Sequence, residues 1–284
     1  MNTVHTRSYH AHYDSYDAQA ETYPSGILAT AYGQRRLPTL IKAGLVITNS
    51  TSRSLVERTS SFSMPLKLEP MVEADVDSWN NIMWSAFGPD LMACMYPTGF
   101  QAADRAIAAK ETIEKMHKPE YTFMKVVDTE LPDDHADGKV VAMARWQAFL
   151  QERSEEELDE ELKEAMETPE EPNLNVPMMQ TFIEDILKTR RHNMGGKPFF
   201  LLSILATHAD HHRRGIGAMH MQWGCDKADE LSLPAYLEAS PKGKGLYERY
   251  GFEAVGNMEF DARKWGHKDE IKHVCMLRPA KKAA

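Results

Sequence analysis

The sequence predicts an α/β (α+β) protein in which strands alternate with amphipathic helices from about residue 64 onward. The nearly continuous apolar run at residues 199–207 has the length and the aromatic start of a buried strand. Elsewhere, apolar side chains such as Trp79, Ile82 and Met83 recur at the spacing of one helix face. With 284 residues, of which 42% are hydrophobic and 26% charged, the chain has enough apolar material for one large domain.

The first 63 residues differ from the rest and are predicted to form a disordered N-terminal extension. Seventeen of them are Ser or Thr and their apolar periodicity is poor, so the segment cannot bury enough surface to offset its ordering entropy. Arginines among Ser and Thr are also typical of a mitochondrial presequence, although Asp14, Asp17 and Glu21 depart from that pattern. We expect a cytoplasmic protein, with mitochondrial import as the alternative.

Five elements are predicted between residues 64 and 150. They are a strand at 66–70, a helix around 79–87, a helix at 102–116, and strands at 121–128 and 139–150. A polar turn that contains Pro132 and Gly138 separates the last two strands, which predicts a hairpin.

An acidic helical insertion is predicted at about residues 151–196. Residues 152–171 contain eleven acids and two bases, an imbalance equal to the formal net charge of −9 for the whole chain. Ser154 followed by Glu157 is a capping box, which predicts the start of a helix with a narrow apolar stripe. A second helix is predicted at 178–192. We expect the acidic helix to dock through its stripe; attraction of a cationic substrate is the alternative.

Composition excludes several classes of protein. The negative net charge argues against nucleic acid as a partner. No stretch approaches the ~18–20 consecutive apolar residues of a membrane helix, so we expect no membrane partner. Cys94, Cys225 and Cys275 are far apart and form no CxxC pair, which predicts neither a disulfide framework nor a zinc knuckle.

A basic, glycine-containing turn follows the buried strand at 199–207 and opens a helix. Glycine lets the backbone approach a ligand closely, and the first amides of a helix point outward and favour phosphate. We expect the turn to bind a phosphate-bearing cofactor through His212, Arg213, Arg214, Gly215, Ile216, Gly217 and Ala218. The turn lacks the remaining residues of a Walker loop and of a dinucleotide fingerprint.

Three motifs in order at residues 201–252 resemble the GNAT superfamily of N-acetyltransferases. The basic turn is similar to the superfamily's R/Q-x-x-G-x-G/A loop, the strand Ala-Tyr-Leu-Glu-Ala-Ser follows at 235–240, and residues 247–252 are similar to its Y-x-x-x-G-F ending. Residues 228–230 and 233–234, between the basic turn and this strand, resemble the same region of fungal members whose substrate is unassigned. For residues 64–284 the resemblance implies a mixed, mostly antiparallel twisted central sheet flanked by helices. His212 stands where the family has Arg or Gln, so we expect a weaker or pH-dependent contact there.

The resemblance implies a reaction and roles for particular residues. The reaction is transfer of an acetyl group from acetyl-CoA, as co-substrate, to a primary amine of a small molecule by direct attack in a ternary complex. Backbone groups near Leu205, Ala206 and Thr207 would polarise the thioester carbonyl. Tyr247 matches the general acid that protonates the departing thiolate, and Glu238 is a candidate base for the amine. Ser240 and Lys242 are candidates for contacting the cofactor.

Several alternatives stay open at this stage. The acceptor could be a protein N-terminus or lysine, and the chain could be a non-catalytic module that binds acyl-CoA. His208 and Asp210 are rival candidates for the base, and together with His211 and His212 they resemble a metal site of a hydrolase, although we expect no metal. Residues 92–97 are a candidate acceptor pocket or plain core. We expect a monomer or a homodimer.

Overall fold

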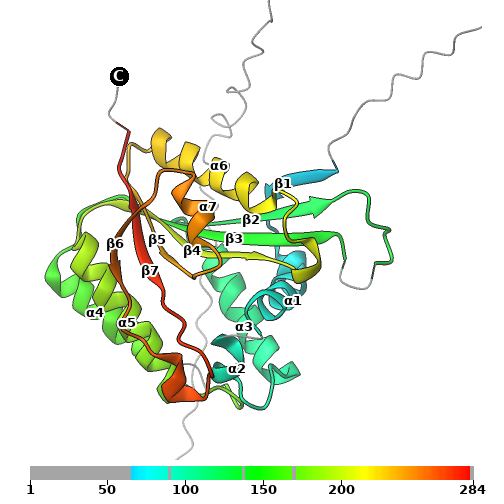
Figure 1. Cartoon of the computed structure of the whole chain (residues 1–284), viewed down its shortest axis with the longest axis horizontal. Helices are drawn as coiled ribbons and strands as arrows, with labels where there is room; N and C mark the ends of the chain where they lie inside the picture. Colours follow the sequence, from blue (N-terminus) through cyan, green and yellow to red (C-terminus); the bar gives the residue numbers. More distant parts are fainter. Residues whose placement is uncertain (1–64, 89–90, 136–137, 168–170, 282–284) are drawn as a thin grey trace, which may run out of the picture. The chain divides into compact units, whose positions relative to one another are not determined.

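A seven-stranded sheet runs through the part of the chain that the computed structural model describes, namely residues 65–88, 91–135, 138–167 and 171–281 (Figure 1). The strands are β1 (Leu66–Pro70), β2 (Tyr121–Asp128), β3 (Val140–Phe149), β4 (Phe199–Thr207), β5 (Ala235–Ala239), β6 (Glu253–Asn257) and β7 (Val274–Arg278). Their order is β1-β2-β3-β4-β5-β7-β6. The β4–β5 pair is parallel and the other neighbours are antiparallel. The predicted extension at residues 1–63 lies outside the described residues.

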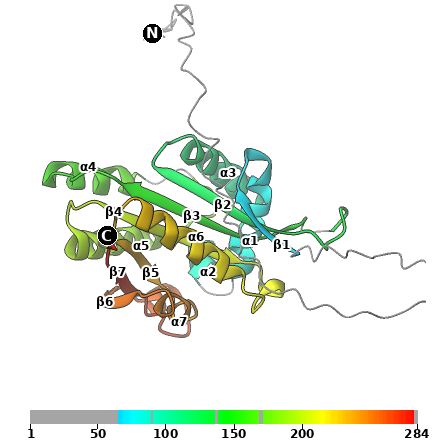
Figure 2. The same cartoon turned by 90° about the horizontal axis from the view of Figure 1, so that it is seen from above.

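Helices cover both faces of this sheet (Figure 2). They are α1 (Val76–Phe87), α2 (Leu91–Met95), α3 (Ala102–Met116), α4 (Glu155–Met166), α5 (Val176–Met194), α6 (Ile216–Glu230) and α7 (Lys244–Glu248). Consecutive residues of β4 show the two faces, because successive side chains of a strand point to opposite sides. Phe200 packs with Met221 of α6, whereas Leu201 packs with Met178 and Met194 of α5. We call the side of the sheet that packs on α6 the α6 face and the opposite side the α5 face.

The predicted fold class and most predicted elements are confirmed. The strands at 66–70, 121–128 and 199–207 and the helix at 102–116 have the predicted bounds, and β2 and β3 form the predicted hairpin. Ser154 caps α4 as expected, because its hydroxyl accepts from the Glu157 amide. No helix in the described ranges is long and apolar enough to cross a membrane.

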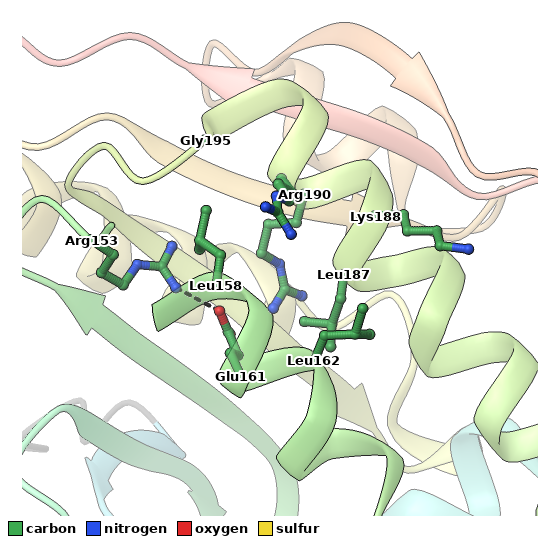
Figure 3. A pocket seen from close by; sticks show the side chains of 9 residues that line it. Arg153, Leu158, Glu161, Leu162, Leu187, Lys188, Arg190 and Gly195 are labelled. Atoms are coloured by element: carbon green, nitrogen blue, oxygen red, sulfur yellow. Dashed lines mark hydrogen bonds and ion pairs between the residues drawn. The ribbon is translucent and has the colours of Figure 1, made fainter. Parts of the chain in front are cut away.

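The segment between β3 and β4, where the sequence predicts an acidic insertion, contains a helical hairpin in which α4 lies against α5 (Figure 1). Leu158 is buried at the contact. Arg191 of α5 pairs with Glu155 and Asp159 of α4, and Arg153 lies 2.7 Å from Glu161 (Figure 3). Acids of α4 therefore have cationic partners within the chain.

A bulge separates β4 into two halves with different neighbours. β3 pairs with β4 as far as Thr207, but the register shifts between Arg145 and Trp146 and leaves Ser203 as an extra residue on β4. β5 pairs only with Phe200 to Leu202. The second half of β4 therefore has an edge that is not paired with β5, which we call the open edge.

Backbone alternation decides which groups face the open edge. The His208 amide donates to the Val141 carbonyl across β3. Because backbone groups alternate sides along a strand, the amide of Ala206 also faces β3. The amides of Leu205 and Thr207 face away from β3, toward the open edge.

Candidate functional site

The chain turns sharply between β4 and α6. A single 3-10 turn, Ala209–His211, follows β4, and α6 begins at Ile216, whose side chain is buried under β2 and β3. Gly215 precedes the helix with a φ of 80°, a left-handed conformation that glycine adopts at no steric cost. The amides of Ile216 and Gly217 precede the first intrahelical bond, so they have no acceptor within the helix. The turn therefore presents two backbone amides that have no acceptor within the helix, and anion binding there stays a prediction.

The two arginines of the turn have different environments. Arg213 is exposed and also has a positive φ of 62°, and no partner holds its side chain within the described ranges. Arg214 instead lies 2.7 Å from the buried carboxylate of Asp128 on β2. Burial opposes ionisation of Asp128, but its hydrogen bonds with Arg214 outweigh this effect, so its pKa lies below the ordinary value. Arg214 therefore anchors the turn to the sheet, and Arg213 is the better candidate for a phosphate contact.

His212 is exposed and its Nε2 lies 3.1 Å from the carbonyl of Thr207, at the end of β4. This contact closes the turn back onto the strand. The prediction of a weaker or pH-dependent cofactor contact through His212 stays a prediction.

Helix α7 holds the start of α6 in place. A Cβ on Gly217 would lie 2.9 Å from the Leu246 side chain, so α7 packs where only glycine fits. The Tyr250 hydroxyl donates a 2.9 Å hydrogen bond to the Ala218 carbonyl. Tyr250 therefore ties the segment after α7 to the first turn of α6.

Tyr247 lies on α7, on the α6 face of the sheet. Its ring is buried with Leu202 and Phe252, and its hydroxyl has no hydrogen-bond partner within the described ranges. Burial raises the pKa of Tyr247 from 10.0 to about 12. The phenol therefore stays protonated at neutral pH, as a proton donor must.

The other predicted cofactor contacts are divided between the strand and the turn before α7. The amides of Leu205 and Thr207 face the open edge, but Ala206 is buried against the α1 side and its amide bonds within the sheet. We therefore do not assign a cofactor contact to the amide of Ala206. Ser240 accepts from the Gly243 amide through both its carbonyl and its hydroxyl, which shapes the turn, and Lys242 is exposed next to it.

Glu238 lies on the α5 face and is held by a cation. Arg190 of α5 donates two hydrogen bonds of 3.2 Å, one to each carboxylate oxygen. The exposed fractions of the two side chains are 12% for Arg190 and 8% for Glu238. Burial lowers the pKa of Arg190, but the charge of Glu238 outweighs this and raises it overall. Both carboxylate oxygens already accept hydrogen bonds from Arg190, so the geometry argues against Glu238 as the base.

The histidine cluster after β4 is loosely arranged. His208 Nδ1 lies 3.9 Å from Asp210, and the rings of His208 and His211 are 5.8 Å apart. Burial and the charge of Arg214 lower the pKa of His211. Among the described residues no group of three or more His, Cys, Asp or Glu side chains has metal-binding geometry.

The candidate acceptor segment at residues 92–97 is mostly core. Met92, Cys94, Met95 and Tyr96 are buried in one cluster with residues of α5. The Tyr96 hydroxyl also donates a 2.6 Å hydrogen bond to Glu171. This placement favours the core interpretation.

Sequence reasoning missed three contacts that shape the site. They are the Arg214–Asp128 pair, the Tyr250–Ala218 hydrogen bond and a 2.8 Å hydrogen bond from Arg145 Nε to the Ser203 hydroxyl. A signal for the last one existed, since Arg145 is the sole charge in β3 and Ser203 interrupts an apolar run.

No protein-family model matches the chain. A segment of 43 residues, or 15% of the chain, is 42% identical to the protein of Ajellomyces capsulatus named probable acyltransferase SID5. The match spans about a third (32%) of that protein's length.

Solved structures match over a much larger part of the chain. Arylalkylamine N-acetyltransferase 2 from Aedes aegypti matches with a TM-score of 0.54 and 10% identity, over 76% of this chain and 99% of that one. The chain has the GNAT fold. Agmatine N-acetyltransferase (TM-score 0.52, 12% identity) and the C-terminal condensation domain of Ebony (0.52, 14%) each match over 75% of this chain and 98% of theirs. The predicted mixed, mostly antiparallel sheet flanked by helices is thus confirmed as a GNAT fold.

Proposed function

We propose that the chain transfers an acetyl group from acetyl-CoA to a primary amine of a small molecule, by direct attack in a ternary complex. One observation carries the proposal. The open edge of β4 leads through the turn at residues 208–215 into α6, whose first amides lack acceptors, and Tyr247 lies on the α6 face of the same sheet. Ligands of α/β sheets bind outside the carboxyl ends of parallel strands, which is where β4 and β5 end.

The residues present fit acetyl-CoA, whose thioester would supply the activated acetyl group. The amides of Ile216 and Gly217, with exposed Arg213, suit its pyrophosphate. Gly215 leaves the turn free of a side chain at that point. The Leu205 amide, which faces the open edge, suits the developing oxyanion.

Two proton transfers complete the reaction. The amine nitrogen attacks the carbonyl carbon, the carbon–sulfur bond breaks, and the Tyr247 hydroxyl gives its proton to the leaving thiolate. The amine must lose one proton in turn. His208 at the end of β4 and Asp210 just beyond it are the remaining candidates for receiving it, because Glu238 is already paired with Arg190.

The printed names of two matched structures support a small amine as acceptor, since they are acetyltransferases of arylalkylamines and of agmatine. We further propose a cytoplasmic protein, monomeric or homodimeric, that needs neither metal, nucleic acid nor membrane.

Thiol release from acetyl-CoA, measured across small amines, peptides with free N-termini and peptides with lysine, tests the proposal. We expect release with at least one class of small amine and acetylated amine in the product. Release with peptides only would favour the protein-acceptor alternative. Tight acetyl-CoA binding without release in any class would favour a non-catalytic acyl-CoA-binding module.

A further inference from the structure

Arg145 is a partly buried cation with no acidic partner within the described part of the chain. It lies on β3 and its Nε donates to the Ser203 hydroxyl. No carboxylate lies within ion-pair distance of its guanidinium in the described ranges, and Glu111 acts on it only through space. Burial lowers the pKa of Arg145. An enclosed charge without a counter-ion is costly, so an anionic ligand group placed beside the guanidinium would be favourable.

Neighbouring cations on the same face are already paired. Arg190 is held by Glu238, Arg153 by Glu161, and Lys115 of α3 lies 3.9 Å from Glu111. Arg145 is therefore the cation of this group that has no carboxylate within ion-pair distance in the described ranges. Two of its nitrogens, Nη1 and Nη2, make no hydrogen bond in the described ranges and form a planar fork that suits a carboxylate.

The position of Arg145 relates this fork to the reaction. Arg145 pairs across the sheet with Ile204, the residue before Leu205, and such hydrogen-bonded partners have Cα atoms about 5.5 Å apart. Ser203, which Arg145 contacts, is the bulged residue where the open edge begins. Met143 and Arg145 share one side of β3, and Met143 packs on α1, opposite the α6 face. Since the cofactor would occupy the α6 face, the acceptor must approach from the side that carries Arg145.

We propose that the acceptor is an amine that also carries a carboxylate, and that Arg145 binds this carboxylate while the amine reaches the open edge of β4. The inference rests on the proposed acetyltransferase function and narrows its substrate class to amino acids and related compounds. Arg145 acts as a specificity-determining residue.

Matched amine pairs test the inference in the full chain. Each protein amino acid is compared with its decarboxylated amine, for example lysine with 1,5-diaminopentane and tyrosine with tyramine, by acetyl-CoA-dependent thiol release. We expect the best acceptor to be a carboxylate-bearing member, with kcat/KM roughly 10- to 100-fold above its partner, the range of a charge-assisted contact. Arg145→Gln should remove this preference, because it should lower kcat/KM only for the carboxylate-bearing member of each pair. Arg145→Lys should keep part of the preference.

Controls separate binding from structure. Arg191→Gln removes a surface cation of α5 and should leave the preference intact. Without substrate, Arg145→Gln should unfold at the same temperature as the wild type or higher, because a charge without a counter-ion is removed. The inference would be overturned if Arg145→Gln lowered kcat/KM equally for both members of each pair, or if the wild type preferred the decarboxylated member. Either result would leave the proposed function in place. If none of the amines supported thiol release, the proposed function itself would be overturned.

Discussion

Arg190 on α5 clamps both carboxylate oxygens of Glu238 on β5, at 3.2 Å each. The pair joins the helical hairpin to the central sheet, on the face where the acceptor would approach. The pair also occupies both oxygens of Glu238, the carboxylate that the sequence indicates as a candidate base. Helix α5 therefore engages a carboxylate that the sequence places among the candidate catalytic groups.

Glu238→Gln should weaken folding far more than catalysis. Removing one partner of a buried ion pair leaves the other charge uncompensated, which costs roughly 3–5 kcal/mol. Urea unfolding should show this loss, whereas kcat per folded enzyme should change little. The double variant Arg190→Met/Glu238→Leu should recover most of the stability. Unchanged stability with a kcat lower by two orders of magnitude would restore Glu238 as the base.

We expect two constraints to keep a side chain out of position 217, namely the contact with Leu246 and the approach of the cofactor to the backbone. Gly217→Ala places a Cβ 2.9 Å from the Leu246 side chain, so we expect a lower melting temperature. Gly217→Ala/Leu246→Ala relieves that contact and should remove the part of the destabilisation that comes from it. If acetyl-CoA affinity, measured by calorimetry, stays low in the double variant, the backbone approach is the cause. Full affinity in Gly217→Val would contradict cofactor binding at this turn.

His220 should make the fold sensitive to acid. Its ring is fully buried, both ring nitrogens lack partners within the described ranges, and burial lowers its pKa from 6.5 to about 3. Between these values the unfolded chain binds a proton that the folded chain does not, so the free energy of unfolding falls as pH falls below 6.5. The slope is up to about 1.4 kcal/mol per pH unit.

His220→Met should flatten that slope between pH 6.5 and 4, as measured by urea unfolding at each pH. His192→Gln, which changes an exposed histidine of α5, serves as the control and should keep the wild-type slope. Identical slopes in wild type and His220→Met would show that the ring reaches solvent.

Residues 1–63 should be dispensable for catalysis, because their composition cannot form a core. A chain that begins at Met64 is expected to unfold cooperatively and to bind acetyl-CoA with wild-type affinity, as measured by calorimetry. A broad, non-cooperative transition in the shortened chain would mean that the extension packs on the domain.

Local patterns predicted the main elements, because their signals are strong and short in range. The apolar run of β4 and the capping box at Ser154 are examples. The five-residue helix α2 and the exposed edge strand β6 were not predicted, since neither has a periodic apolar face. The contacts Arg190–Glu238 and Arg214–Asp128 join residues 48 and 86 positions apart, and no local pattern contains such pairings.

Tyr247→Phe tests the central claim most directly, because it removes one proton donor and keeps the buried ring. The measurement is kcat for thiol release from acetyl-CoA with the best amine, under conditions where chemistry limits the rate. We expect kcat to fall by ~10²-fold or more with acetyl-CoA affinity nearly unchanged. Tyr250→Phe should instead weaken acetyl-CoA binding and leave kcat nearly unchanged, since it loses the hydrogen bond to the Ala218 carbonyl. A Tyr247→Phe variant that keeps most of its kcat would contradict the account.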